Sequence, residues 1–326
     1  MSETLLVAAV RGLIVKQSLG KGLQIQDDLF LSNELDQLNK LIGRDLKLAM
    51  GGLEWLHLQK SCFIYYLKRD LAFELEQARS ALEVFLQNGR VFFQALWLVR
   101  DNAVNVELGF LETENAEGQK IGSSNYIVSL FARHDGSLDE EAFDLDDLKR
   151  ARSFYQSHLL PLVFESTSVE DLTHPPPAYS LAFCKNASRL SRFNTFLSGV
   201  RSERDLPVRI AQAMTCFEVL FSSDASELSH KLSERVAWFV GEGSKGRREI
   251  YSLLKRAYGV RSKVVHGDTL SPALLAELEV ISREIDNLLR QVFLRIIDSK
   301  ETIEFFTSGN QQLEEYFLNL VLGGYE

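Results

Sequence analysis

The stretch Tyr258–Asp268, with the sequence YGVRSKVVHGD, holds the residues best suited to chemistry. Arg261 is a permanent cation, and His266 exchanges protons near neutral pH. A fixed cation beside such a group suits phosphodiester chemistry, because the imidazole can take a proton while the cation stabilises charge on phosphate oxygens. Between residues 245 and 263 there are seven Lys and Arg residues against one acid, Glu249. We therefore interpret this basic stretch as the candidate site.

The charge of the chain is unevenly distributed. The 326 residues carry a formal net charge of −9, which argues against indiscriminate binding to nucleic acids or membranes. Residues 178–263 contain 15 Lys and Arg and 8 Asp and Glu, a local charge of +7, so the remainder carries −16. A polyanionic partner is therefore expected to bind the region that contains the candidate site.

The cysteines and the apolar segments indicate a protein of a reducing compartment. Cys62, Cys184 and Cys216 are odd in number and lack a CxxC spacing, so we expect small buried hydrophobes and no disulfide. The segment 5–15 is apolar but has no basic n-region, which argues against a signal peptide. No uncharged apolar run reaches the ~18–20 residues of a membrane span. We expect a cytoplasmic protein that does not bind membranes.

An α+β fold class is predicted, with a mixed α/β domain over residues 1–174. Apolar and β-branched runs predict strands over 5–15, 23–31, 62–67, 91–99, 104–111 and 126–132. Helical spacing predicts helices over 35–42, over 70–86 with Asn88-Gly89 as its end, and over a segment capped by Asp144 or Asp146. This domain is expected to have a sensing or regulatory role.

The triplet Pro175-Pro176-Pro177 marks the predicted domain boundary. The second domain, residues 178–326, has apolar residues at helical spacing throughout. Predicted helices include one opened by Asp205 and Pro207, one capped by Ser226, one over 246–258 that ends at Gly259, and a long one from Ser271-Pro272 to about Asp298. Short helices are expected around Phe305 and Tyr316. Helices joined by short loops predict an all-α bundle.

Three blocks in this second half resemble the Apea-like branch of the HEPN superfamily. They are CFEVLF, which contains Glu218, KLSERVAWFVG, which contains Arg235, and YGVRSKVVHGD. The resemblance covers residues 205–299, and its most specific part is the last block. It implies a helical domain that dimerises and acts as a metal-independent endoribonuclease without a cofactor. Such proteins occur in bacterial antiphage and toxin–antitoxin systems, so the resemblance also implies a phage-derived or antitoxin trigger.

Arg261 and His266 match the R-x4-6-H catalytic pair of that family. Ribonucleolytic members usually have Asn, Asp or His directly after the arginine, whereas this chain has Ser262, whose hydroxyl can donate or accept one hydrogen bond. We take Arg261, Ser262 and His266 as the candidate catalytic residues. Lys255, Arg256 and Lys263 are the candidate RNA contacts.

The spacing of the pair favours a site built by two subunits. Residues five apart on an ideal helix are separated by about 140°, so Arg261 and His266 do not share a face. In a two-fold dimer, the arginine of one subunit can face the histidine of the other. A homodimer through the helical domain is therefore expected.

Other notable residues are interpreted as structural. Glu218 is flanked by apolar residues, so we expect it to be buried beside an arginine, with Arg235 as a candidate partner. Trp55, Trp97 and Trp238 are expected in the core. His230 lies one turn before Glu234 on a predicted helix, and a role in the site stays open. The remaining histidines (His57, His134, His158 and His174) lack the spacing of metal ligands, and no metal site is predicted.

Three functions remain open on the sequence alone. The first is a metal-independent RNA endonuclease controlled by the N-terminal domain. The second is a non-catalytic HEPN module that binds RNA or a nucleotide or only dimerises, and Ser262 favours it. The third is a pure interaction protein that uses the 271–298 helix as its dimer face.

Overall fold

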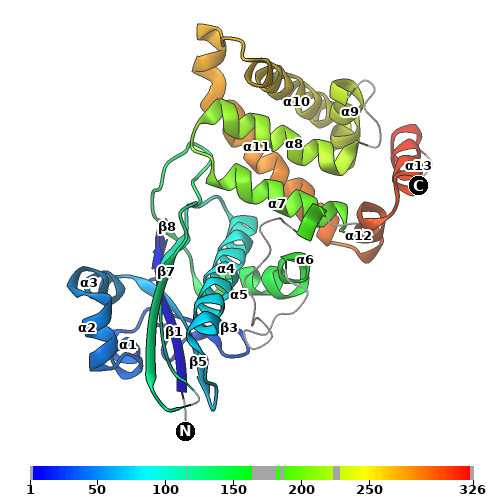
Figure 1. The fold of residues 1–326 in the computed structure, drawn as a ribbon. Coiled ribbons are helices and arrows are strands. Elements are labelled where there is room, and N and C mark those ends of the chain that lie inside the picture. The colour runs from blue at the N-terminus through cyan, green and yellow to red at the C-terminus, as the bar shows by residue number, and fades with distance from the viewer. Residues whose placement is uncertain (1–2, 116, 164–180, 184–186, 223–227, 324–326) are drawn as a thin grey trace. The chain divides into compact units, whose positions relative to one another are not determined.

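The computed structural model describes residues 3–115, 117–163, 181–183, 187–222 and 228–323. It divides into two compact units. Unit 1 comprises Met1–Phe131 and Leu138–Ala178, and unit 2 comprises Ala132–Ser137 and Tyr179–Glu326. An antiparallel sheet region is followed by a helical C-terminal part, so the fold is of the α+β class (Figure 1). The proline triplet at 175–177 lies outside the described residues.

Unit 1 is built on a six-stranded antiparallel sheet with the strand order β3-β4-β5-β1-β6-β7. The strands are β1 (Glu3–Arg11), β3 (Leu23–Gln26), β4 (Leu29–Ser32), β5 (Cys62–Arg69), β6 (Asn105–Glu114) and β7 (Lys120–Tyr126). A small parallel pair joins β2 (Leu13–Ile14) to β8 (Glu141–Ala142). The predicted strand over 23–31 is therefore a hairpin, which turns at Asp27 and Asp28.

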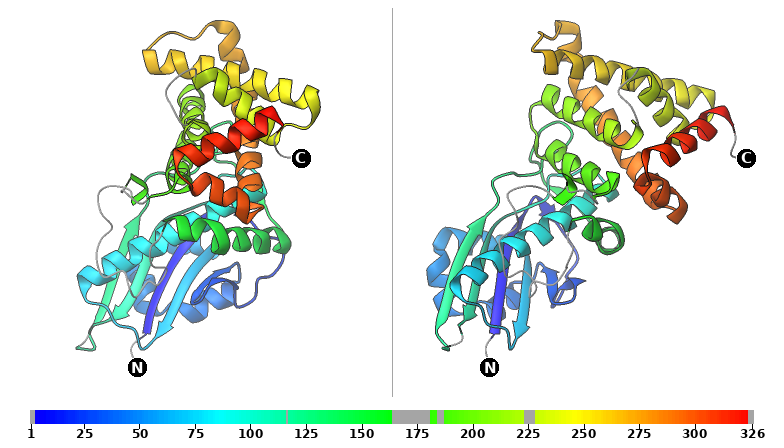
Figure 2. Two further views of the ribbon diagram at one scale, coloured as in Figure 1. Left: turned by 90° about the vertical axis from the view of Figure 1, so that its right-hand side faces the viewer. Right: turned by 45° about the vertical axis from the view of Figure 1, so that its right-hand side comes forward.

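Helices cover both faces of this sheet (Figures 1 and 2). Successive residues of a strand point to opposite faces, so Leu5 and Val7 of β1 pack against one layer of helices. That layer contains α1 (Leu35–Leu41), α2 (Arg44–Met50) and α3 (Gly52–Lys60). The opposite face packs on α4 (Leu75–Val99), where Gly109 of β6 leaves room for Leu82 and Leu86.

The helix α4 corrects two predictions. It continues through Asn88-Gly89, and the predicted strand over 91–99 is its second half. An apolar run of this kind does not distinguish a strand from a buried helix, and here Phe92, Phe93 and Trp97 are all fully buried. Gly89 lies where the helix approaches the sheet, because an added Cβ would stand 2.5 Å from Ile64 Cδ1. Packing thus overrides the local stop signal.

The end of unit 1 was predicted with mixed success. The helix α5 (Leu145–Phe154) is capped by Asp144, whose side chain accepts from the Asp147 amide, as expected. It is followed by the π-helical turn η1 (Tyr155–Leu159) and α6 (Leu160–Val163). The strand predicted over 126–132 is wrong, because β7 ends at Tyr126. Phe131 is buried outside the sheet, where Asn105 Nδ2 donates to its carbonyl at 2.9 Å.

Unit 2 is helical wherever it forms regular structure in the part that is described (Figure 1). Its elements are the short η3 (Leu181–Phe183), α7 (Arg189–Ser202), α8 (Leu206–Phe221), α9 (Leu228–Val240), α10 (Gly243–His266), α11 (Pro272–Ile297), α12 (Lys300–Thr307) and α13 (Asn310–Leu322). Asp205 caps α8 and Ser271 caps α11, as predicted. The predicted cap of α9, Ser226, lies outside the described residues.

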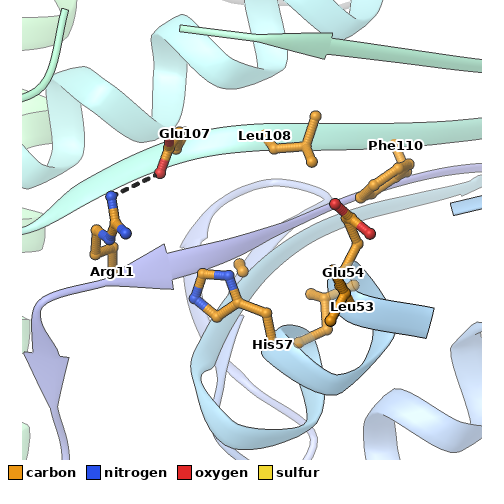
Figure 3. A pocket seen from close by; sticks show the side chains of 9 residues that line it. Arg11, Leu53, Glu54, His57, Glu107, Leu108 and Phe110 are labelled. Atoms are coloured by element: carbon orange, nitrogen blue, oxygen red, sulfur yellow. Dashed lines mark hydrogen bonds and ion pairs between the residues drawn. The ribbon is translucent and has the colours of Figure 1, made fainter. Parts of the chain in front are cut away.

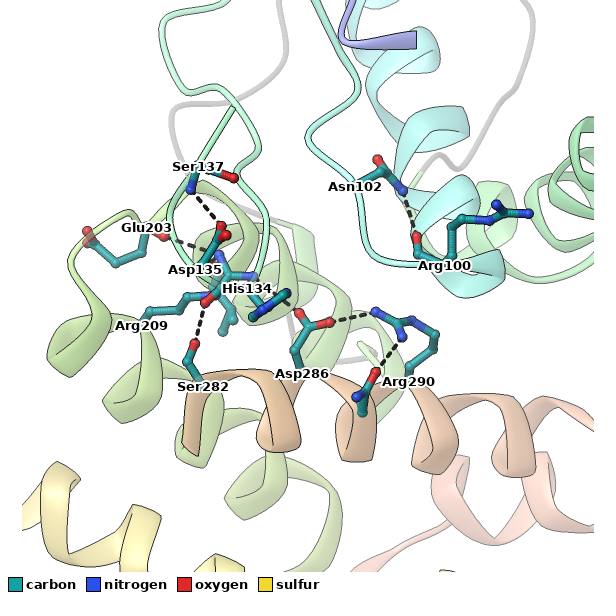
Figure 4. Close-up of polar contacts among 12 residues, drawn as sticks. Arg100, Asn102, His134, Asp135, Ser137, Glu203, Arg209, Ser282, Asp286 and Arg290 are labelled. Carbon is teal, nitrogen blue, oxygen red and sulfur yellow. Dashed lines mark hydrogen bonds and ion pairs between the residues drawn. The ribbon is translucent and has the colours of Figure 1, made fainter. Parts of the chain in front are cut away.

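Unit 2 also includes the segment Ala132–Ser137, although both of its flanking segments belong to unit 1. Ser282 Oγ of α11 donates to the His134 carbonyl at 2.6 Å (Figure 4). Arg204 Nε donates to the Gly136 carbonyl at 2.9 Å. Gly136 has a φ of +78°, and an added Cβ would stand 2.5 Å from the Arg204 carbonyl oxygen. A side chain at this position is therefore excluded by both conformation and space.

A buried charge network lies beside this segment (Figure 4). Arg209 of α8 pairs with Asp286 of α11 at 3.2 Å, with side chains 2% and 3% exposed. Arg209 also donates to the carbonyls of Val200 and Glu203, and Arg290 supplies a second cation to Asp286 at 2.6 Å. Because burying ions costs free energy unless each is fully paired, this network fixes how α7, α8 and α11 pack.

Two further predictions concern the cysteines and membrane spans. Cys62 and Cys216 are buried, as expected, and burial raises the pKa of both thiols, that of Cys62 to about 11. Cys184 lies outside the described residues. None of the helices described here combines the length and the apolar character needed to span a bilayer.

Candidate active site on α10

All six candidate site residues lie on one helix, α10. The predicted end of this helix at Gly259 is wrong, because the helix continues for almost two more turns to His266. An interior glycine costs roughly 1 kcal/mol relative to alanine, but Ala257 and Val260, on either side of it, are fully buried. Their packing therefore carries the helix through Gly259, and the whole R-x4-H motif is helical.

The true end of α10 is a left-handed cap at Gly267. This residue has a φ of +75°, which glycine adopts without steric cost. The Gly267 amide donates to the Val264 carbonyl at 3.3 Å, and the Asp268 amide donates to the Lys263 carbonyl at 2.8 Å. These bonds satisfy carbonyls that the end of a helix otherwise leaves unpaired. His266 is thus the last helical residue.

Arg261 points toward α8 and pairs with Glu218. Its Nη2 lies 2.9 Å from Glu218 Oε2, and the two side chains are 25% and 15% exposed. The guanidinium carbon also lies 5.3 Å from the centre of the Tyr258 ring. Arg261 Nε and Glu218 Oε1 are buried and have no hydrogen-bond partner among the described residues. The arginine is therefore held in place while part of its hydrogen-bonding capacity is unused.

Burial raises the pKa of the Glu218 carboxyl, and the adjacent Arg261 opposes part of that shift. The sequence predicted a buried glutamate beside an arginine. Glu218 is half-buried, and its arginine partner is Arg261. Arg235, the expected candidate, donates to the Phe221 carbonyl at 2.8 Å and pairs with Glu314 of α13 at 2.5 Å.

His266 and Arg261 do not meet within one chain. Both belong to α10, so their five-residue separation places them about 140° apart around the helix axis. Arg261 turns toward α8, whereas His266 is exposed. Ser262 is half-buried on the face of α10 that carries His266. The structure therefore brings Arg261 together with Glu218 and leaves His266 open to a partner.

The three candidate RNA contacts differ in their surroundings. Lys255 is exposed, and its Nζ donates to Ser229 Oγ at 2.9 Å. Arg256 pairs with two glutamates of α11, Glu277 at 3.6 Å and Glu284 at 3.3 Å. Lys263 is half-buried and has no acidic partner in the described part of the chain. The charges of Lys255 and Lys263 are thus more available to a phosphate than that of Arg256.

The sequence did not indicate a second group of residues on α9 and α10. Trp238, which was expected in the core with Trp97, is only half-buried, and Arg247 stacks on its ring at 3.6 Å. His230 is exposed, and its Nδ1 lies 2.9 Å from the hydroxyl oxygen of Tyr251. The feature of the sequence that could have revealed this group is the recurrence of basic and aromatic residues at helical spacing. That recurrence becomes apparent only when α10 is treated as one continuous helix.

Unit 1 contains a separate hollow of about 250 Å³ between α3 and the sheet (Figure 3). Glu54 and His57 extend into it from α3, and Arg11 of β1 pairs with Glu107 of β6 at 3.0 Å along its edge. Trp55, also on α3, is half-buried below Lys47. The Glu107 carboxylate therefore already balances the charge of Arg11, and the side chains of His57 and Glu54 remain available to a ligand.

The arrangement on α10 can supply a positioned cation and an exposed imidazole. Among the described residues, no three His, Cys, Asp or Glu side chains lie together in a manner that could hold a metal ion. No family model matches the sequence, and neither a curated protein nor a solved structure is detectably similar to the chain.

Proposed function

We propose that unit 2 is a metal-independent RNA endonuclease of the HEPN type that acts as a homodimer. One observation carries this proposal. Arg261 is anchored by Glu218 on one side of α10, while His266 is exposed at the capped end of the same helix. The cation and the proton acceptor that phosphodiester cleavage requires are thus fixed on one rigid element, and the resemblance described above names the same two residues.

The chemistry that follows is an intramolecular transesterification. The neutral imidazole of His266 takes the proton of a ribose 2′-hydroxyl, and the 2′-oxygen attacks the adjacent phosphorus. As the bond to the 5′-oxygen breaks, that oxygen takes up a proton, which the imidazolium can return. Arg261 stabilises the charge that develops on the non-bridging oxygens. The products are a 2′,3′-cyclic phosphate and a 5′-hydroxyl.

A homodimer would complete the site. Because Arg261 and His266 lie about 140° apart on α10, a two-fold axis can bring one subunit's arginine to the other's histidine. The exposed apolar side chains of Val265 and Leu275 lie near His266 in the sequence, at the end of α10 and the start of α11. We propose this corner, residues 265–277, as part of the dimer contact.

A second candidate function is a non-catalytic RNA-binding module. Its support is the carboxylate of Glu218, which already occupies one edge of the Arg261 guanidinium, together with Ser262 in place of a more polar amide or charged residue. Because the Glu218 carboxylate balances the charge of Arg261, this arginine stabilises the negative charge of a phosphorane-like transition state less than an unpaired arginine would. This candidate predicts that RNA binds and is not cut.

The deciding experiment incubates the purified full chain with total RNA in EDTA and maps the new ends. Cleavage with 2′,3′-cyclic phosphate ends, which a 2′-deoxyribose at the scissile position blocks, supports the nuclease. His266→Ala is expected to lower the rate by on the order of 10²–10⁴, while His158→Ala, which removes a histidine of unit 1 outside the hollow between α3 and the sheet, serves as the matched control. Activity that appears only when Mg²⁺ is restored would exclude this mechanism.

The resemblance extends the proposal to antiphage defence or a toxin system. In that setting, unit 1 would sense a phage-derived or antitoxin trigger and restrain unit 2 in its absence. The hollow that contains His57 and Glu54 is the feature of unit 1 that we propose for this role.

A further inference from the structure

A surface pocket of about 350 Å³ lies between α9 and α10, far along α10 from His266. Its walls combine two aromatic rings with two arginines and one acid. They are formed mainly by Glu234 and Trp238 of α9 and by Arg247, Arg248 and Tyr251 of α10. We call this feature the Trp238 pocket. Aromatic rings beside cations are the side chains that proteins use to bind single-stranded nucleic acids.

One side of the pocket is a preorganised stack. The guanidinium carbon of Arg247 lies 3.6 Å from the centre of the Trp238 ring, and Arg247 Nε donates to the Gly241 carbonyl at 3.3 Å. Gly241 permits this close turn, because an added Cβ would lie 3.0 Å from Arg247 Cα and closer still to the Ala237 carbonyl oxygen. The cation is therefore fixed as a flat surface over the indole, and guanidinium planes of this kind can stack on bases.

The other side is a positioned tyrosine. The hydroxyl of Tyr251 lies 2.9 Å from His230 Nδ1, and the two rings meet edge to face at 5.9 Å with an interplanar angle of 81°. This contact links α9 to α10 and limits the rotation of the Tyr251 ring. The pocket thus has two fixed planar groups before any ligand arrives, which lowers the entropy cost of binding.

The charges around the pocket define where a phosphate can lie. Arg248 is exposed and has no acidic partner among the residues that the structure describes. Glu234, on the α9 wall, repels phosphates but can accept a hydrogen bond from an exocyclic amine or a ribose hydroxyl. A nucleotide is therefore expected to direct its phosphate toward Arg248 and its base and sugar toward α9.

The helical geometry connects this pocket to His266. At 100° per residue, Arg248, Lys255, Ser262 and His266 fall within about 40° of one another around α10. The 18 residues from Arg248 to His266 span about 27 Å along the axis at 1.5 Å per residue. Arg248, Lys255 and His266 are all exposed. A chain of phosphates that leaves the pocket can thus follow one face of α10 past Lys255 to His266.

We propose that the Trp238 pocket binds one nucleotide of a single-stranded RNA, with the base stacked on Arg247 and Tyr251 and the phosphate on Arg248, and that the RNA backbone then follows α10 toward His266. This inference rests on the proposed nuclease function, because it assigns the path of that substrate. It goes beyond the nuclease function because the Trp238 pocket contributes to RNA binding and does not contact the atoms that react.

Binding is measured by fluorescence anisotropy of a labelled single-stranded RNA of about ten nucleotides, with the full chain in a His266→Ala background to prevent cleavage. Trp238→Ala removes the ring that holds the Arg247 guanidinium in place. Because stacking contributes roughly 1–3 kcal/mol per base, loss of this platform is expected to raise Kd by about 5- to 150-fold. Arg248→Gln, an exposed change that leaves the fold intact, should raise Kd several-fold and reduce the salt dependence.

Two matched controls are available in the chain. Trp55 of unit 1 is also half-buried below a cation, with Lys47 Nζ 4.3 Å from its ring centre, so Trp55→Ala controls for the loss of an indole. Arg283, exposed on α11, controls for the loss of a cation through Arg283→Gln. Both control variants should bind with the Kd of the His266→Ala background.

The outcomes separate this inference from the nuclease function. Weaker binding by both pocket variants and by neither control supports the pocket, whether or not the wild-type protein cuts RNA. Unchanged Kd values in Trp238→Ala and Arg248→Gln overturn the pocket, even if wild-type protein cuts RNA. An absence of binding to the RNA also overturns it, as does a preference for single-stranded DNA of the same sequence over the RNA.

Discussion

The guanidinium of Arg261 and the carboxylate of Glu218 join α10 to α8, with 2.9 Å between Nη2 and Oε2. This pair orients the arginine away from His266, although both residues belong to the R-x4-H motif of the same helix. Arg261, which could bind a phosphate, is thus held in place by the half-buried carboxylate of Glu218.

The first prediction is complementation between subunits. Arg261→Ala and His266→Ala homodimers should each be inactive, whereas a mixed dimer should recover part of the cleavage rate. In the mixed dimer, one composite site receives both lesions and the other pairs an intact Arg261 with an intact His266. Differently tagged heterodimers are isolated and assayed beside both homodimers and the wild type. A folded but inactive heterodimer, with the wild type active, would contradict a shared site.

The second prediction concerns stability and pH at Glu218. Burial raises the pKa of this carboxyl above its ordinary value of 4.5, so the folded protein binds a proton there more tightly than the unfolded chain. Its contribution to the free energy of unfolding is fully present below pH 4.5 and is lost as the pH rises through the folded-state pKa. The stability of wild type relative to Glu218→Gln should therefore fall with rising pH.

Urea unfolding of both proteins between pH 4 and pH 7 measures this difference. Glu279→Gln, an exposed change on α11, is the control and should show a smaller dependence. If wild type instead gains stability relative to Glu218→Gln as the pH rises, the attraction of Arg261 outweighs the burial of the carboxylate.

The third prediction concerns the salt dependence of RNA binding. Each lysine that contacts a phosphate of a single strand contributes about 0.7 to the slope of log K against log salt. Lys255→Gln and Lys263→Gln should each reduce the slope by about this amount. Arg256→Gln should have a smaller effect, because Glu277 and Glu284 already balance its charge. Unaltered slopes in both lysine variants would show that RNA approaches another surface.

The fourth prediction tests the helical state of the motif. Gly259 lies within α10, and an added Cβ there would meet nothing within 4 Å. Gly259→Ala should therefore raise the free energy of unfolding by about 0.5–1 kcal/mol, because alanine loses less backbone entropy in a helix. Gly267→Ala, at a φ of +75°, is the matched opposite and should destabilise the protein. A destabilised Gly259→Ala variant would argue that the helix breaks there.

The sequence predicted the features that depend on local chemistry. Asp144, Asp205 and Ser271 cap helices as expected, because a side-chain oxygen that accepts from a nearby backbone amide acts within a few residues. The basic stretch and the candidate pair Arg261 and His266 also follow from residue types and spacing alone. So does the α+β organisation, since the hydrophobic period changes along the chain.

Only the tertiary structure decided which local signals were overridden and which side chains meet. Gly89 and Gly259 read as helix ends, yet burial of their neighbours continues both α4 and α10. The choice of Arg261, and not Arg235, as the partner of Glu218 depends on how α10 packs on α8, far apart in the sequence. The packing of α9 on α10 likewise leaves Trp238 at the surface beneath Arg247. Contacts of this kind join distant segments, so they depend on the free energy of the whole fold and not on any local sequence pattern.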